Sequence, residues 1–282
     1  MRIKKIHKKK KVNLKLKQFK SKYDIKTDED DIKLPCLSVF VGARGSGKTY
    51  SCVAMVSHFE KKGYITRTFL ISPTMQSNEI FHNLETLDEN DVCERVENFE
   101  HALTHVVQRV DFDWEQYKNN KNYYNIYKKY TKQQHLTIKE EKILEEKEYA
   151  LPEIPIQPAH MLIVDDMQGS DIYSNHKKND LMKHLSIKHR HIPLSICFLV
   201  QSWHGLPRVL RLNATHFALY KTGDKKQLQQ IYENFGNLIS YEEFVEMYKH
   251  ATSVPHGFLF IDTVPKKEKY RYRNGFNEYF EL

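Results

Sequence analysis

The sequence predicts an α/β fold in which helices cover both faces of a mostly parallel sheet. Short apolar runs of strand length alternate along the chain with segments of helical pattern, which is typical of such a sheet. The first apolar run also leads directly into a glycine-rich loop and then into a helix. A chain of 282 residues is long enough to bury a sizeable core in one large domain.

Six apolar runs are expected to form strands of this sheet. They are residues 34–42, 66–74, 161–166, 195–202, 215–222 and 257–263. Helices are expected at residues 49–63, 79–87, 180–188, 225–235 and 242–250. Because helices separate most of these strands, we expect mostly parallel pairing.

The chain has the composition of a protein that works inside a cell. No apolar run approaches the roughly 20 residues that span a bilayer, and the N-terminus lacks the apolar stretch of a secretory signal. We therefore expect no membrane-spanning segment. The four cysteines are scattered, three of them in apolar runs, and are interpreted as reduced, buried thiols: Cys36, Cys52, Cys93 and Cys197.

The net charge of +8 is concentrated at the N-terminus. Residues 1–22, the basic arm, contain eleven Lys and Arg and no acidic residue, which leaves 33 basic and 36 acidic residues in the remainder. We therefore divide the chain into a disordered basic arm with an acidic linker, residues 1–32, and a domain, residues 33–282. Three roles stay open for the basic arm: nucleic-acid binding, nuclear import, or a solubilising tail.

Residues 99–158 are charged and rich in aromatics, and we interpret them as a helical insertion in the domain. Thr137 and Glu140 have the spacing of a capping box, which predicts a helix start. The aromatic side chains could stack on nucleic-acid bases. Packing against the core or a neighbouring subunit is the favoured interpretation. They are Trp114, Tyr117, Tyr123, Tyr124, Tyr127 and Tyr130.

The loop after the first expected strand matches the P-loop pattern G-x-x-x-x-G-K-[ST]. Its glycines let successive backbone N–H groups bind phosphate oxygens, and the following helix adds its positive N-terminal end. Lys48 is expected to reach the β and γ phosphates and to be catalytic, and the Thr49 hydroxyl to bind magnesium. ATP and Mg²⁺ are the cofactors indicated. The expected nucleotide-binding residues are Gly42, Ala43, Arg44, Gly45, Ser46, Gly47, Lys48 and Thr49.

Two carboxylates end the apolar run MLIVDD. We expect this strand beside the P-loop strand, where its last residues would lie next to the phosphates. Asp165 would then help to hold Mg²⁺, and Asp166 would orient and deprotonate the attacking water. Gln201 ends the run SICFLVQ and is expected to touch the γ phosphate or the water as a sensor.

Phosphoryl transfer also uses positive charge in the transition state, often an arginine from a neighbouring subunit. Arg190 is our candidate, with Arg208 and Arg211 as alternatives. Three histidines near Arg190 lack cysteine partners and are interpreted as surface residues: His184, His189 and His191.

The ordered segments GARGSGKT, ISPT, MLIVDD, KHRHIPLSICFLVQS, LPRVLRLNATHF and YRYRNGF resemble a known family. They look like the genome-packaging ATPases of nucleocytoplasmic large DNA viruses, virophages and polinton-like elements, within the FtsK/HerA superfamily of DNA-translocating motors. The resemblance covers Leu34 to the C-terminus, except for the helical insertion at residues 99–158. It implies an additional-strand, RecA-like P-loop NTPase core in which GARGSGKT is the Walker A loop, Asp165 and Asp166 are the Walker B pair, and Gln201 is the sensor.

The resemblance also implies a homo-oligomeric ring that pumps double-stranded DNA into a preformed capsid, docked to a capsid or portal-like vertex protein. Such a motor would act in a cytoplasmic virus factory or in the nucleus and associate with virions. A cellular or plasmid DNA translocase or helicase would use the same residues. A P-loop nucleotide kinase and a non-catalytic DNA-binding scaffold are alternatives from other classes. A GTPase is disfavoured because the chain has no [NT]KxD motif.

Overall fold

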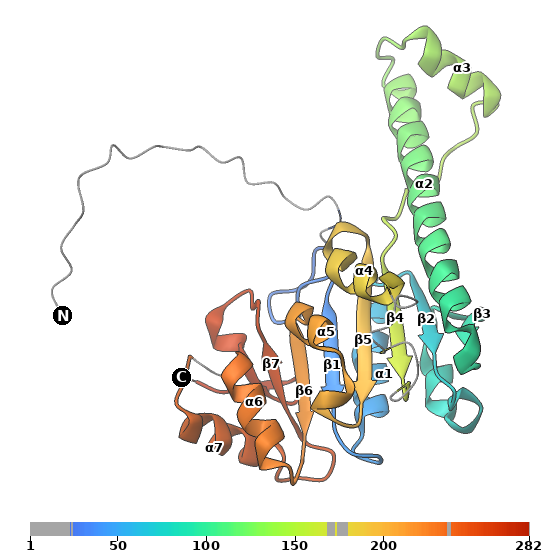
Figure 1. The fold of residues 1–282 in the computed structure, drawn as a ribbon. Helices are drawn as coiled ribbons and strands as arrows, with labels where there is room; N and C mark the ends of the chain where they lie inside the picture. The colour runs from blue at the N-terminus through green and yellow to red at the C-terminus, as the bar shows by residue number, and fades with distance from the viewer. Residues whose placement is uncertain (1–22, 24, 168–172, 174–179, 236–237, 282) are drawn as a thin grey trace, which may run out of the picture.

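One sheet organises the fold (Figure 1). The computed structural model describes residues 23, 25–167, 173, 180–235 and 238–281. The basic arm lies outside these ranges, so its disorder and its roles stay predictions. Within the described ranges the sheet has nine strands in the order β3-β2-β4-β5-β1-β6-β7-β8-β9.

The first six strands of this sheet run parallel to one another. Five of them are uninterrupted or nearly uninterrupted buried runs, as expected where helices cover both faces. The predicted α/β fold with a mostly parallel sheet is confirmed. The strands are Leu37–Val41 (β1), Arg67–Ile71 (β2), Leu87–Cys93 (β3), His160–Asp165 (β4), Leu194–Val200 (β5) and His216–Tyr220 (β6).

The position of β4 differs from our prediction. It does not lie beside the P-loop strand β1, because β5 is inserted between them: Val39 is opposite Phe198, and Ile163 is opposite Cys197. All three strands are buried apolar runs, so nothing in their composition distinguishes one order from another. The intervening strand fits the additional-strand type of P-loop core that the resemblance implies.

The last three strands of the chain extend the sheet in antiparallel pairing. β7 (Phe258–Asp262) pairs antiparallel with β6, and β8 (Tyr272–Asn274) and β9 (Glu278–Tyr279) continue the sheet in the same manner. The start of β7 therefore lies next to the end of β6, because Tyr220 is opposite Phe258. This brings the turn before β7 to the C-terminal ends of the parallel strands, where the P-loop also lies.

Helices cover both faces of the sheet, as predicted (Figure 1). α1 (Lys48–Lys61) packs on one face with strand residues such as Phe40 and Leu70. The alternate residues, such as Val39 and Phe69, point to the other face, since successive side chains of a strand alternate. That face is covered by α2 (Phe99–Thr131), α4 (Asp180–Lys188), α5 (Arg208–Asn213), α6 (Lys225–Phe235) and α7 (Tyr241–Ala251).

The helical insertion projects from the body of the protein. Figure 1 shows α2 rising well beyond the sheet, with α3 (Ile138–Glu146) beside its far end. The predicted capping box at Thr137 and Glu140 is present and opens α3. Tyr130 lies 6.0 Å from Tyr127 and 5.3 Å from Tyr149 between ring centroids, so these aromatics pack against one another within the insertion.

Ion pairs attach the base of α2 to the sheet. Asp113 of α2 lies 3.3 Å from Arg67 of β2, 3.2 Å from Arg109 and 3.0 Å from His160, the first residue of β4. Arg67 also pairs with buried Asp91 of β3 at 2.6 Å. Burial alone would raise the pKa of Asp113, but the hydrogen bond from His160 and the nearby charges, including those of Arg109 and Arg67, hold it below its ordinary value. The network joins the projecting helix to three strands.

Two local predictions are wrong, the helix at 79–87 and the burial of Cys93. The expected helix is replaced by short 3-10 turns, Met75–Ser77 and Glu79–Asn83, followed by strand β3. β3 has the sequence LDENDVC and lies at the edge of the sheet, where polar side chains face solvent, so it lacked an apolar signal. Its last residue, Cys93, is half-buried, whereas Cys36, Cys52 and Cys197 are buried as expected.

The acidic linker is attached to the body. Asp28 pairs with Lys62 of α1 at 2.7 Å, Asp31 lies 2.9 Å from His58, and Glu29 pairs with Lys267. These contacts hold residues 28–31 against α1 and against the segment between β7 and β8.

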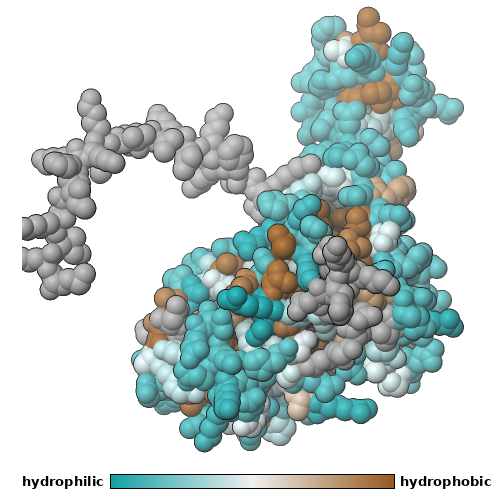
Figure 2. Space-filling model, in the orientation of Figure 1, coloured by the Kyte–Doolittle hydropathy of each residue, from teal (hydrophilic) through white to brown (hydrophobic). Residues whose placement is uncertain are grey.

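The face shown in Figure 2 is mostly polar, with apolar atoms visible on the helical insertion. Exposed apolar side chains of that insertion include Ile138, Leu151, Ile154 and Ile156. Within the described ranges, none of the helices combines the length and the apolar character needed to cross a membrane.

Candidate functional site

The P-loop connects β1 to α1 and has a backbone that requires glycine. Gly45 and Gly47 have φ angles of 75° and 96°, a region that other residues rarely adopt. A Cβ at Gly42 would lie 2.6 Å from both Ser46 Oγ and Tyr220 Cβ, so no side chain fits there. Ser46 Oγ is buried without a hydrogen-bond partner among the described residues, which leaves it able to donate to a phosphate oxygen.

Lys48 is the first residue of α1 and is almost fully buried. Its Nζ donates to the carbonyl oxygens of Gly42, at 2.7 Å, and Ala43, at 3.0 Å. Burial lowers the pKa of Lys48, and the carboxylates of Asp165 and Asp166 oppose this shift. The helix start has no side-chain cap, so its first N–H groups are free to bind an anion.

Thr49 and Asp165 bring two oxygen ligands together from α1 and β4. Thr49 Oγ1 donates to Asp165 Oδ2 at 3.3 Å. Burial and the neighbouring Asp166 raise the pKa of Asp165 to about 6, because both disfavour a negative charge on this carboxylate. A hydroxyl and a buried carboxylate suit Mg²⁺, which prefers oxygen ligands. The residues present therefore fit the expected metal, and Thr49 and Asp165 would hold it.

Asp166 and Gln201 form the second pair of the site. Gln201 Nε2 donates to Asp166 Oδ1 at 2.9 Å, and both side chains are exposed to solvent. Asp166 has a φ angle of 50°, so the chain turns sharply at the end of β4 and the carboxylate is turned out of the strand. The pair lies at the ends of two adjacent parallel strands, where a ligand in the P-loop would be within reach.

These residues line one cleft of about 370 Å³. It contains Arg44 to Thr49 of the P-loop together with Asp165, Asp166 and Gln201. The fold therefore brings together the residues predicted from three separate segments of the sequence. It also adds Tyr50 of α1 and three polar residues that follow β2, which we did not predict: Thr74, Ser77 and Asn78.

The arginine candidates lie away from this cleft. Arg190 is exposed and precedes β5, so it lies at the N-terminal ends of the parallel strands, whereas the P-loop lies at their C-terminal ends. Its predicted role therefore requires a neighbouring subunit and stays a prediction. Arg208 begins α5 and is exposed, and Arg211 lies with its Cζ 5.1 Å from the centre of the Trp203 ring.

One histidine prediction is wrong. His184 and His191 are exposed as expected, but His189 is fully buried. Burial lowers the pKa of His189 to about 4, so this side chain is neutral, and its Nδ1 donates to the Ser186 carbonyl at 2.7 Å. The turn of the chain into β5 buries the ring, although its neighbours in sequence are polar.

Sequence reasoning also missed two side chains that contact the P-loop. Tyr220 ends β6 and lies against Gly42, and His256 precedes β7 and lies against Gly47. Both are far from the P-loop in sequence. Only the pairing of β1, β6 and β7 brings them to it, and no local pattern marks them.

Comparison with known proteins supports this architecture. No family model and no curated protein matches the chain. Among solved structures, the genome packaging NTPase B204 of Sulfolobus turreted icosahedral virus 2, in complex with AMP, covers 82% of this chain and 94% of its own. The sequence identity is 15% and the TM-score is 0.50. The chain has the fold of this viral packaging NTPase.

Two other solved structures are similar. B204, the DNA-packaging ATPase of Sulfolobus turreted icosahedral virus, matches 83% of this chain and 95% of its own, with 13% identity and a TM-score of 0.48. The pCW3 conjugation coupling protein TcpA matches 86% of this chain and 65% of its own, with 14% identity and a TM-score of 0.47. The match at a TM-score of 0.50 agrees with the P-loop fold that the sequence predicted.

Proposed function

We propose that this protein is an ATPase that hydrolyses ATP at the P-loop cleft and uses the energy to translocate double-stranded DNA. The observation that carries the proposal is the convergence of Lys48, the pair Thr49 and Asp165, and the pair Asp166 and Gln201 in one cleft. Phosphoryl transfer needs a phosphate cradle, a metal site and a group that activates water. The cleft contains residues suited to all three.

Each residue has a distinct task in this mechanism. The P-loop amides and Lys48 bind the phosphates, and Mg²⁺ held at Thr49 and Asp165 would neutralise charge on them. Asp166 accepts a proton as the water oxygen bonds to the γ phosphorus and the bond to the β–γ bridging oxygen breaks. Gln201, hydrogen-bonded to Asp166, holds that carboxylate in position.

The finer proposal is that this motor packages a viral genome into a preformed capsid. It is supported by the resemblance of the motifs and by the fold shared with B204, which was solved as a genome packaging NTPase in complex with AMP. The proposal includes a homo-oligomeric ring, an arginine such as Arg190 supplied by a neighbouring subunit, and a capsid or portal-like docking partner. It assigns the protein to the inside of the infected cell, in a virus factory or the nucleus, and to virions.

The test is the rate of ATP hydrolysis with and without long duplex DNA, measured on size-fractionated protein. A motor is expected to hydrolyse ATP faster when long DNA is present, in an oligomeric fraction. Turnover that depends on a small phosphate acceptor and ignores DNA would identify a kinase. DNA binding without any turnover would identify a scaffold, and either result would refute the motor.

A further inference from the structure

His256 packs against the P-loop from the turn between α7 and β7. A Cβ placed on Gly47 would lie 3.0 Å from His256 Cβ and 3.1 Å from His256 Nδ1, so the ring lies directly over this glycine. The side chain is exposed to solvent. It flanks the cleft at Gly47 without lining it, so it would meet a ligand where that ligand extends past Gly47.

The turn that carries His256 is held in an unusual conformation. His256 has a φ angle of 63°, which costs free energy for a residue with a side chain. Gly257 follows it, where a Cβ would lie 2.3 Å from the Ala251 carbonyl oxygen. Strained backbone of this kind persists where the surroundings enforce it and is concentrated at functional sites.

The helix before this turn is fixed to the other neighbour of the P-loop. Tyr248 of α7 donates to the carbonyl oxygen of Tyr220 at 2.9 Å and accepts from the N–H of Thr222 at 2.7 Å. Tyr220 itself lies against Gly42. The position of His256 relative to the phosphate cradle is therefore set by a buried contact.

The strand order indicates which part of a nucleotide would face His256. Asp166 and Gln201 end β4 and β5, on one side of β1, whereas His256 precedes β7, beyond β6 on the other side (Figure 1). Under the proposed function the γ phosphate lies at Asp166. The phosphate chain then crosses the start of α1, and the nucleoside leaves the loop on the side of β6 and β7.

We propose that His256 contacts the nucleoside of the bound nucleotide, with the imidazole stacked on the base. It thereby gives the cleft part of its preference for nucleotides over inorganic polyphosphate. The inference rests on the proposed nucleotide site and adds a specificity residue to it. A flat, exposed ring beside the phosphate cradle offers a surface for any base, since every base has an aromatic face.

The test compares equilibrium binding of ATP and inorganic tripolyphosphate to three variants. His256→Asn removes the ring but keeps a residue that tolerates positive φ, so the turn is preserved. His256→Phe keeps a flat aromatic face. His191→Asn is the matched control, because His191 is exposed at the N-terminal ends of the parallel strands, away from the P-loop.

His256→Asn is expected to weaken ATP binding about tenfold, the scale of one aromatic stacking contact, and to leave tripolyphosphate binding unchanged. His256→Phe should restore most of the loss, and His191→Asn should behave as wild type. Equal weakening of both ligands would mean that His256 only supports the loop, and no change in either would remove it from the site. Both results overturn the inference while the nucleotide site stands. A wild-type protein that binds neither ligand would refute the proposed function, and the inference with it.

Discussion

Gln201 Nε2 donates a 2.9 Å hydrogen bond to Asp166 Oδ1, which joins the end of β5 to the end of β4. The two residues are 35 positions apart in sequence and come from adjacent strands. If Asp166 activates the water as we propose, this hydrogen bond holds its carboxylate in position. The bond thus links the predicted sensor to the predicted base.

Asp166→Asn should retain nucleotide binding and lose turnover, because the amide cannot accept the proton of the water. We expect a fall in kcat of roughly 10² to 10⁴. Gln201→Ala should lower kcat about tenfold, since one hydrogen bond to a charged group is lost. Steady-state kinetics and nucleotide titration check both, with His204→Ala as the control at an exposed neighbouring position. Unchanged kcat in Asp166→Asn would show that another residue activates the water.

The sequence identified the strands that form the core and the cleft, because β1, β4 and β5 are continuous buried runs and the P-loop has a specific spacing. It did not reveal that β5 separates β4 from β1, since buried strands of similar composition carry no label for their neighbours. β3 escaped prediction because it is an edge strand with the mostly polar sequence LDENDVC, which lacks the apolar run expected of a buried strand. His256 escaped because only tertiary pairing brings it to Gly47.

Asp113→Ala should destabilise the protein, because it removes the shared partner of Arg67, Arg109 and fully buried His160. We expect a loss of roughly 2 kcal/mol in the free energy of unfolding. Glu115→Ala, two residues further along the same helix, is the control. Glu115 forms an exposed pair with Lys118, and such pairs contribute less than about 1 kcal/mol. Urea denaturation of the two variants measures the difference, and equal stabilities would contradict the role of the network.

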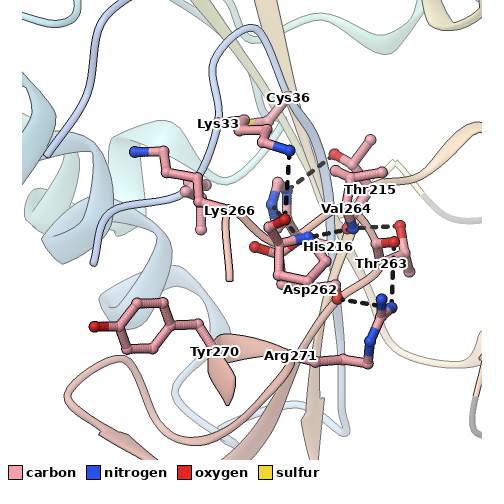
Figure 3. Close-up of polar contacts among 12 residues, drawn as sticks. Lys33, Cys36, Thr215, His216, Asp262, Thr263, Val264, Lys266, Tyr270 and Arg271 are labelled. Atoms are coloured by element: carbon pink, nitrogen blue, oxygen red, sulfur yellow. Dashed lines mark hydrogen bonds and ion pairs between the residues drawn. The ribbon is translucent and has the colours of Figure 1, made fainter. Parts of the chain in front are cut away.

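The buried pair His216 and Asp262 makes stability depend on pH (Figure 3). His216 Nε2 lies 3.4 Å from Asp262 Oδ1, at the end of β6 that is far from the P-loop. Burial alone would lower the pKa of His216, but the Asp262 carboxylate raises it to about 9. The ordinary value of 6.5 applies in the unfolded chain. The contribution is therefore complete below pH 6.5 and is lost as pH rises through about 9.

The wild-type free energy of unfolding should accordingly fall by up to about 3 kcal/mol from this group between these limits. Asp262→Asn removes the charge that raises the pKa of His216, so this component of the pH dependence should disappear. Urea denaturation of both proteins across the pH series isolates the effect of the pair. Parallel pH profiles would show that His216 is not charged in the folded protein.

Activity should require assembly if an arginine is supplied between subunits. Specific ATPase activity should then rise with protein concentration. Mixing inactive Arg190→Ala with inactive Lys48→Ala should restore part of the activity, because some interfaces regain both residues. Absence of rescue would move the assignment to Arg208 or Arg211, and constant specific activity from a monomer would refute the shared site.

Deleting the basic arm should weaken DNA binding while leaving DNA-independent hydrolysis close to normal, because the P-loop begins only at Gly42 and uses none of the arm's lysines. Each neutralised phosphate contributes about 0.9 to the slope of log affinity against log salt, so losing four or five lysine contacts should flatten the slope by roughly four. DNA binding by full-length and truncated protein across a salt series measures it. Matching slopes would refute the DNA-binding role, and a changed cellular location with an unchanged slope would indicate nuclear import.

The hydrolysis rate of Lys48→Ala tests the ATPase assignment most directly. Lys48 is the buried cation of the phosphate cradle, whereas Lys61, at the other end of the same helix, is exposed and serves as the control. We predict that Lys48→Ala loses turnover by roughly a hundredfold or more while Lys61→Ala hydrolyses ATP at the wild-type rate. Wild-type turnover in a folded Lys48→Ala protein would contradict the account.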